Sequence, residues 1–170
     1  MKRSFLIMAV CLFFGVNCSA TTGSEKLSIL EYESQLYSAV KHAVSLGGLV
    51  EDSRFDANAS IGDIHDDGLD RLIFKLLFFA NERLKECQNS KGYNRGYTID
   101  ELCKTHKEHT LSTVEILIRK GLDTKKSGAF FISPAHCVRF YKCNSKTKHE
   151  KLFYSKILVL LRNSESLIKS

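Results

Sequence analysis

The stretch "LDRLIFKLLFFANERLKEC" (residues 69–87) decides the fold of this chain. Its apolar side chains recur every three or four residues, which is the spacing of one face of an α-helix. The stripe consists of Leu69, Leu72, Ile73, Leu76, Leu77, Ala80, Leu84 and Cys87. Three phenylalanines widen it around most of the helix: Phe74, Phe78 and Phe79. A helix that is apolar on nearly every side packs against several neighbours, so we expect this one at the centre of the fold.

Helical periodicity continues on both sides of this segment. Residues 25–46 carry apolar side chains at helical spacing until two adjacent glycines break the pattern. Those apolar positions are Ile29, Leu36, Val40, Ala43 and Val44. Downstream, Thr98 and Glu101 match a capping box that begins another helix, and Gly121 ends it. Three long helices are therefore expected before residue 122.

The C-terminal third predicts two more helices. After a loop and a short extended piece over 124–132, Ser133 and Pro134 are suited to the N-cap and first position of a short helix ending near Cys143. The last helix covers about 149–168. Its inward positions are Leu152, Phe153, Ile157, Leu160, Leu161, Leu167 and Ile168. Four main helices and one short one, joined by modest loops, predict an all-α bundle.

The first twenty residues have the pattern of a secretory signal peptide. Two basic residues precede an uncharged apolar run over 6–16, and small side chains stand at the −3 and −1 positions of a cleavage after Ala20. This run is too short to cross a bilayer, which takes about 20 residues, and no later segment is long and apolar enough to do so. We therefore expect a secreted, extracellular protein in which residues 21–170 form a single helical domain.

Loss of residues 1–20 would leave four cysteines. They are Cys87, Cys103, Cys137 and Cys143. An even number in an oxidising compartment predicts two disulfides that staple the bundle.

The expected short helix restricts how the cysteines pair. Cys137 and Cys143 lie six residues apart, so they would point about 120° away from each other and stand about 9 Å apart along the axis. A disulfide needs Cα atoms within about 7 Å, so each must reach Cys87 or Cys103. Of the two arrangements that remain, we favour Cys87 with Cys143 and Cys103 with Cys137.

Residues 58–60 read Asn-Ala-Ser, an acceptor triplet for N-glycosylation. Its neighbours are polar and acidic, as expected of an exposed loop. Asn58 is therefore a candidate glycosylation site.

Charge is distributed unevenly along the chain. Residues 21–70 hold ten Asp/Glu and three Lys/Arg, whereas residues 71–170 hold nine Asp/Glu and twenty Lys/Arg. Such asymmetry favours attraction to a charged partner. The basic side chains that we expect to bind it are Arg139, Lys142, Lys146, Lys148, Lys151 and Lys156, interleaved with Phe140, Tyr141 and Tyr154. Outside the cell, the expected partner is an extracellular protein or a sulfated glycan rather than nucleic acid.

The sequence contains no motif typical of catalysis. No GxSxG elbow is present, and neither CxxC nor HExxH occurs. We therefore expect a non-enzymatic binding protein with a signalling, inhibitory or effector role, and no cofactor or metal.

Two alternatives remain open. The phenylalanines could line a cavity, which would make the protein a carrier of small apolar ligands. They are Phe74, Phe78, Phe79, Phe130 and Phe131. The second alternative is a metal-dependent enzyme, because Cys103, His106 and His109 are spaced to share part of one helix face.

Overall fold

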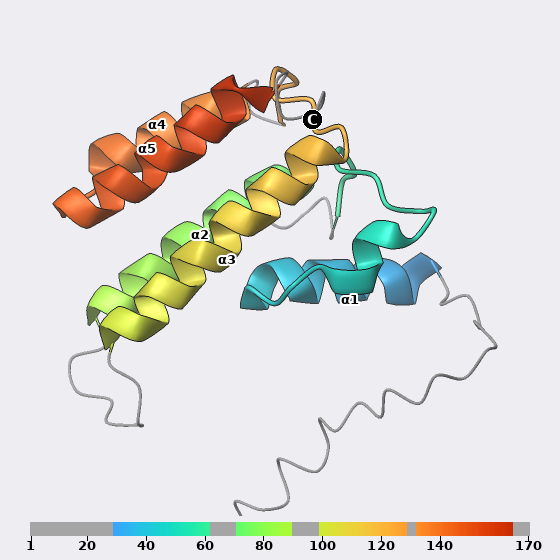
Figure 1. The fold of residues 1–170 in the computed structure, drawn as a ribbon, viewed down its shortest axis with the longest axis horizontal. Coiled ribbons are helices and arrows are strands. Elements are labelled where there is room, and N and C mark those ends of the chain that lie inside the picture. The colour runs from blue at the N-terminus through green and yellow to red at the C-terminus, as the bar shows by residue number, and fades with distance from the viewer. Residues whose placement is uncertain (1–28, 62–70, 90–98, 129–131, 165–170) are drawn as a thin grey trace, which may run out of the picture.

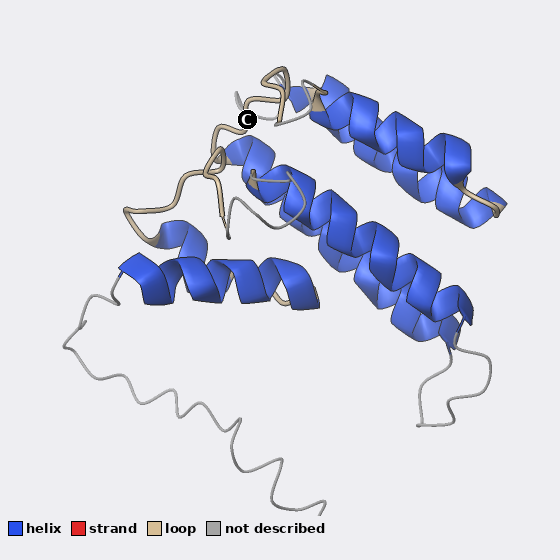
Figure 2. Cartoon of the chain, turned by 180° about the vertical axis from the view of Figure 1, so that it is seen from behind, coloured by secondary structure: helices blue, strands red, loops and turns tan. Residues whose placement is uncertain are grey.

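A computed structural model describes residues 29–61, 71–89, 99–128 and 132–164 of the chain (Figure 1). Its elements are α1 (Ile29–His42), the 3-10 helix η1 (Gly47–Glu51), α2 (Leu72–Asn89), α3 (Ile99–Arg119), α4 (Pro134–Asn144) and α5 (Lys148–Arg162). Within these ranges the chain forms helices and loops, without a strand (Figure 2). The predicted all-α fold is confirmed, and α4 is the one short helix, with 11 residues. The proposed signal peptide lies outside the described residues.

The helices are arranged in layers. Both views show α2 and α3 as an antiparallel hairpin in the middle, with α4 and α5 on one side and α1 crossing on the other (Figures 1 and 2). Helix α2 packs against α1, α3 and α4, and α5 packs against α3 and α4. Helix α2 is therefore central, as its apolar circumference predicts.

Close packing around α2 involves its aromatic residues. Phe74 is buried beneath Gly128, and a Cβ atom at Gly128 would lie 2.6 Å from Phe74 Cε2. Phe79 packs edge-on against Tyr37 of α1, with 5.7 Å between the ring centroids. Phe74 and Phe79 thus pack against the rest of the fold, whereas half-buried Phe78 contacts the Phe79 ring of its own helix. Phe130 and Phe131 lie outside the described residues.

Helix α1 is shorter than its sequence pattern predicts. It ends at His42, and Ala43 follows with a φ of 52°. Arg83 of α2 donates hydrogen bonds from Nη1 to Val40 O (3.1 Å) and Lys41 O (2.5 Å), so carbonyls in the last turn already have a partner. Ile29 and Val44, at the two ends of the predicted stripe, are 67% and 57% exposed.

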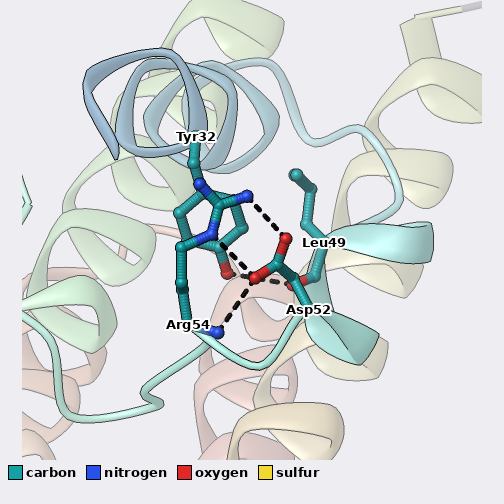
Figure 3. A network of polar contacts seen from close by, with 4 residues as sticks. All are labelled: Tyr32, Leu49, Asp52 and Arg54. Carbon is teal, nitrogen blue, oxygen red and sulfur yellow. Dashed lines mark hydrogen bonds and ion pairs between the residues drawn. The ribbon is translucent and has the colours of Figure 1, made fainter. Parts of the chain in front are cut away.

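A polar network holds η1 and the following turn against α1 (Figure 3). Tyr32 of α1 donates from its hydroxyl to Leu49 O at 2.9 Å. The guanidinium of Arg54 stacks over the Tyr32 ring, 4.6 Å from its centroid, and pairs with Asp52 at 2.6 Å. The two glycines predicted to end α1 therefore begin a separate 3-10 turn instead.

Side-chain caps begin the last two helices, at Ser133 as predicted and at Thr147, which was not predicted. The Ser133 side chain accepts a hydrogen bond from His136 N, with Pro134 in the first helical position. At α5, Thr147 and Glu150 form a complete capping box, which starts the helix at Lys148. Helix α5 ends at Arg162, with Asn163 as its C-cap, so it is shorter than the predicted helix over 149–168. Leu167 and Ile168 lie outside the described residues.

Candidate binding surface

The six basic residues predicted to bind a partner all lie on the α4–α5 hairpin. Arg139 and Lys142 belong to α4, and Lys146 lies in the turn. The other three, Lys148, Lys151 and Lys156, belong to α5. Five are exposed and Lys142 is half-buried. Among the described residues, none of the six forms an ion pair with a carboxylate. We refer to residues 133–162 as the basic layer.

The basic layer contains a single acidic residue. It holds seven Lys/Arg residues, the six above and Arg162, and one acidic residue, Glu150, so its formal charge is +6. Glu150 is 8% exposed, and its Oε2 accepts from the backbone N–H groups of Lys146 (2.9 Å) and Thr147 (3.0 Å). Its Oε1 accepts from Gln88 Nε2 of α2. The one carboxylate of the basic layer is therefore hydrogen-bonded to the turn and to α2 rather than paired with the exposed lysine side chains.

The aromatic residues of this segment divide between core and surface. Phe140 is 65% exposed, whereas Tyr154 is buried and donates from its hydroxyl to Asn81 Oδ1 at 3.1 Å. Tyr141 is half-buried, with its ring centroid 5.9 Å from that of Tyr154. Burial raises the pKa of both tyrosines above the usual value. Of the three aromatics grouped with the lysines, Phe140 alone is exposed enough to contact a partner.

A polar pocket of about 250 Å³ lies where α2 meets the basic layer. It is lined by Asn81, Lys85, Gln88, Asn89, Tyr141, Asn144, Ser145, Lys146, Glu150 and Tyr154. Lys146 is the one predicted binding residue among them. The α2 residues were not predicted, because their contribution depends on how two helices far apart in sequence pack together. Their polar positions opposite the apolar stripe are the only sequence signal for them.

The charge asymmetry of the sequence persists in space. The described N-terminal part, residues 29–61, holds five Asp/Glu and two Lys/Arg, whereas the basic layer carries +6. Helix α1 and the α4–α5 hairpin lie on opposite sides of the α2–α3 hairpin in both views (Figures 1 and 2). Folding thus keeps the two sets of charges apart among the described residues.

The predicted disulfide stapling is not shown by the structure. All four cysteines are described, and all four are free thiols. Burial, with Cys103 nearby on α3, raises the pKa of Cys87 to about 12, and burial raises the pKa of Cys137 to about 11. Cys137 lies on the buried side of α4, and Cys143 is exposed. Neither Cys87 with Cys143 nor Cys103 with Cys137 is joined by a disulfide in this structure.

His106 and His109 lie on α3, close to each other and to Arg83. Burial lowers the pKa of His106, and the charges of Arg83 and His109 lower it further. Across the described residues, no cluster of three His, Cys, Asp or Glu side chains is arranged to hold a metal ion.

The candidate glycosylation residue, Asn58, is part of a hydrogen-bond network. Its Nδ2 donates to Gly121 O at 3.0 Å, and its Oδ1 accepts from Asp123 N at 2.7 Å and from Arg71 Nη2 at 2.8 Å. Arg71 is buried and also donates to Lys126 O at 2.5 Å. Asn58 Oδ1 therefore joins Arg71, just before α2, to the loop after α3, and the amide nitrogen that a glycan would occupy bonds to Gly121 O in the same network.

Comparison of the chain with protein-family models, with curated proteins and with solved structures finds no match. None of the described helices combines the length and apolar character needed to cross a membrane. The function is therefore argued from the residues of the basic layer.

Proposed function

We propose that this protein is secreted and acts by binding an anionic extracellular macromolecule, without catalysis. The basic layer supplies the binding surface, and the partner is an acidic protein face or a sulfated glycan. Such a protein would have a signalling, inhibitory or effector role.

One observation carries this proposal. The single carboxylate of the basic layer is buried and hydrogen-bonded, while its lysines and arginines have no acidic partner among the described residues. Exposed charges of one sign on a surface attract an oppositely charged partner and raise its association rate. Exposed Phe140 adds an apolar contact on the same helical hairpin.

Secretion is part of the same proposal. It is supported by the basic and apolar pattern of residues 1–20 and the small residues before the expected cleavage. The compartment limits the polyanions that the basic layer can meet, because nucleic acid is scarce outside cells. Recovery of a chain beginning at Thr21 from the culture medium would support this part of the proposal, and an uncleaved chain retained in the cell would contradict it.

Charge reversal tests the binding surface. We expect the triple variant Lys142→Glu, Lys146→Glu and Lys148→Glu to lose about tenfold or more in affinity for heparin, used here as the sulfated glycan. Fewer cations then displace fewer counterions, so the slope of log K against log salt should fall by about 2–3. Titration at several salt concentrations measures both changes.

The matched control reverses three lysines near the other end of the α2–α3 hairpin: Lys120, Lys125 and Lys126. It has the same net charge as the test variant and should keep nearly the original affinity. Equal losses in the two variants would mean that only net charge matters and that the basic layer is not the site. Pull-downs from extracellular fluid with the same pair of variants apply the test to an acidic protein partner.

A further inference from the structure

We infer that the polar pocket between α2 and the basic layer binds one sugar ring of a sulfated glycan. Carboxamide side chains hold the hydroxyl groups of the ring, and two lysines hold its anionic groups. This inference rests on the proposed function, because it selects the glycan rather than an acidic protein face as the partner of the basic layer. The pocket volume of about 250 Å³ is smaller than the roughly 300–1,000 Å³ of sites for drug-sized molecules, so it suits a single ring.

The pocket has walls from three helices. Helix α2 contributes four residues at the spacing of one helix face: Asn81, Lys85, Gln88 and Asn89. The opposite wall consists of residues from α4, the turn and α5, all within the basic layer. Half-buried Tyr141 gives this wall an aromatic surface for the apolar C–H groups of a sugar ring. A glycan seated in the pocket can therefore continue over the exposed cations of the basic layer.

Carboxamides are the commonest polar groups of the pocket. They belong to Asn81, Gln88, Asn89 and Asn144. Gln88 Nε2 donates to Glu150 Oε1, and Asn144 Nδ2 donates to Phe140 O at 2.9 Å. Each of these bonds uses one of the four hydrogen-bonding positions of its amide and fixes the orientation of the side chain. Sugar hydroxyls, which both donate and accept, match the remaining positions of such amides.

Two helices end at the pocket. Asn89 is the last residue of α2, Asn144 is the last residue of α4, and both line it. The final carbonyl groups of a helix lack partners within the helix and give that end a partial negative charge. Sugar hydroxyls can donate to such carbonyls, whereas a bare sulfate ion would be repelled by them. A polyhydroxylated ring therefore suits this part of the pocket better than a free anion.

Two lysines supply the positive charge of the pocket. Lys146 is exposed in the turn, and exposed Lys85 of α2 lies 2.7 Å from Glu82 Oε1 through its Nζ atom. The carboxylate that lines the pocket, Glu150, accepts from Gln88 and from two backbone N–H groups of the turn. Its negative charge is therefore compensated by three donors, and sulfate or carboxylate groups carried by the ring can bind the two ammonium groups.

Three probes test the pocket by calorimetric titration of the full chain. They are a heparin disaccharide of a uronate and a sulfated glucosamine, its unsulfated N-acetylated counterpart, and sodium sulfate. We expect the sulfated disaccharide to bind more tightly than either of the others, because it alone supplies both hydroxyl and sulfate groups. Equal affinity for sodium sulfate or for the unsulfated disaccharide would overturn the inference. So would absence of disaccharide binding in a chain that still binds polymeric heparin.

Removal of two carboxamides tests the site without changing its charge. The variant Asn89→Ala with Asn144→Ala alters two exposed positions, so it should fold and bind the sulfated disaccharide about tenfold more weakly. The matched control, Gln35→Ala with Ser38→Ala, removes two exposed uncharged groups of α1 and should keep the original affinity. Equal affinities in the two variants would overturn the inference.

The same carboxamide variant separates this inference from the proposed function. It removes no cation, so the slope of log K against log salt for polymeric heparin should stay as in the original chain. Failure of the proposed function appears instead as unchanged heparin binding in the charge-reversal variant of the basic layer. Heparin binding that depends on the basic layer, together with a carboxamide variant of unchanged disaccharide affinity, would overturn the pocket alone.

Lys85 provides a test outside the basic layer. We expect Lys85→Gln to weaken binding of the sulfated disaccharide about threefold and to leave the unsulfated one nearly unaffected. Lys120→Gln is the matched control, because Lys120 is also paired with a glutamate, Glu51, at 3.2 Å. The inference would be overturned if the two substitutions had the same effect, or if Lys85→Gln weakened both disaccharides equally.

Discussion

Arg83 connects three helices through one side chain. It lies in the buried stripe of α2, donates to the last-turn carbonyls of α1, and its charge lowers the pKa of His106 on α3. A cation at the C-terminal end of α1 also interacts favourably with that helix's dipole. Burial lowers the pKa of Arg83, as expected for a charge removed from water. Holding α1 in place therefore requires a buried cation, and this cation in turn affects His106.

The lowered pKa of His106 makes stability depend on pH. The unfolded chain, with a histidine pKa near 6.5, binds the proton more readily than the folded one. The contribution of His106 is therefore fully present above about pH 6.5 and is lost as pH falls toward its folded pKa. We expect a lower free energy of unfolding at pH 5.5 than at pH 7.5 by urea titration.

The His106→Gln variant should show a flatter pH dependence over this range, because the titrating group is gone. Replacing exposed His149 on α5 by Gln provides the control and should leave the pH dependence as it is in the original chain. An unchanged slope in His106→Gln would show that other groups cause the pH effect.

At the scale of the helix, the α4–α5 turn depends on the Thr147–Glu150 capping box. Thr147 Oγ1 accepts a hydrogen bond from Glu150 N at 3.2 Å, and Glu150 Oε2 accepts one from Thr147 N at 3.0 Å. We expect Thr147→Ala to lower the free energy of unfolding by about 0.5–2 kcal/mol, measured by denaturant titration. Loss of this cap would also loosen the turn that carries Lys146.

Thr105→Ala is the matched control for this substitution. Thr105 is exposed within α3, and its hydroxyl donates back to Glu101 O at 2.9 Å, so alanine there should cost little. If the two substitutions had the same small effect, the capping box would contribute nothing measurable to the start of α5.

Helix positions could be predicted where local chemistry decides them. The cap at Ser133 and the apolar run of α2 are contained in a few adjacent residues, whereas the predicted cap at Thr98 lies outside the described residues. The end of α1 could not be predicted, because Arg83, more than forty residues away, satisfies its last carbonyls. The grouping of the six basic residues on one hairpin follows from their closeness in sequence and from the packing of the two adjacent helices that carry them.

The nearness of Cys103 to Cys87 and the pocket were not predictable in the same way. Each depends on the packing of helices that are distant in sequence: α2 with α3 for Cys87 and Cys103, and α2 with α4 and α5 for the pocket. Helical periodicity gives the buried face of each helix but not its axial position against a neighbour. One turn of sliding, about 5.4 Å, changes which residues meet.

At the scale of the whole molecule, the layers predict a gradient of stability. Helix α2 packs against α1, α3 and α4, and Leu72, Ile73 and Leu77 are completely buried. Opening its amides requires the surrounding layers to separate, whereas α1 can detach by breaking mainly its contact with α2. We therefore expect native-state hydrogen exchange to be slowest in α2, close to the global unfolding free energy, and faster in α1.

The basic layer should behave as a unit in the same experiment. Helices α4 and α5 pack most extensively on each other, so their amides should share one opening free energy that is lower than that of α2. Heparin bound to this layer adds stability only while α4 and α5 are folded, so it should slow exchange in both helices together. Protection confined to α1, or spread evenly over all five helices, would contradict both the layered stability and the location of the binding surface.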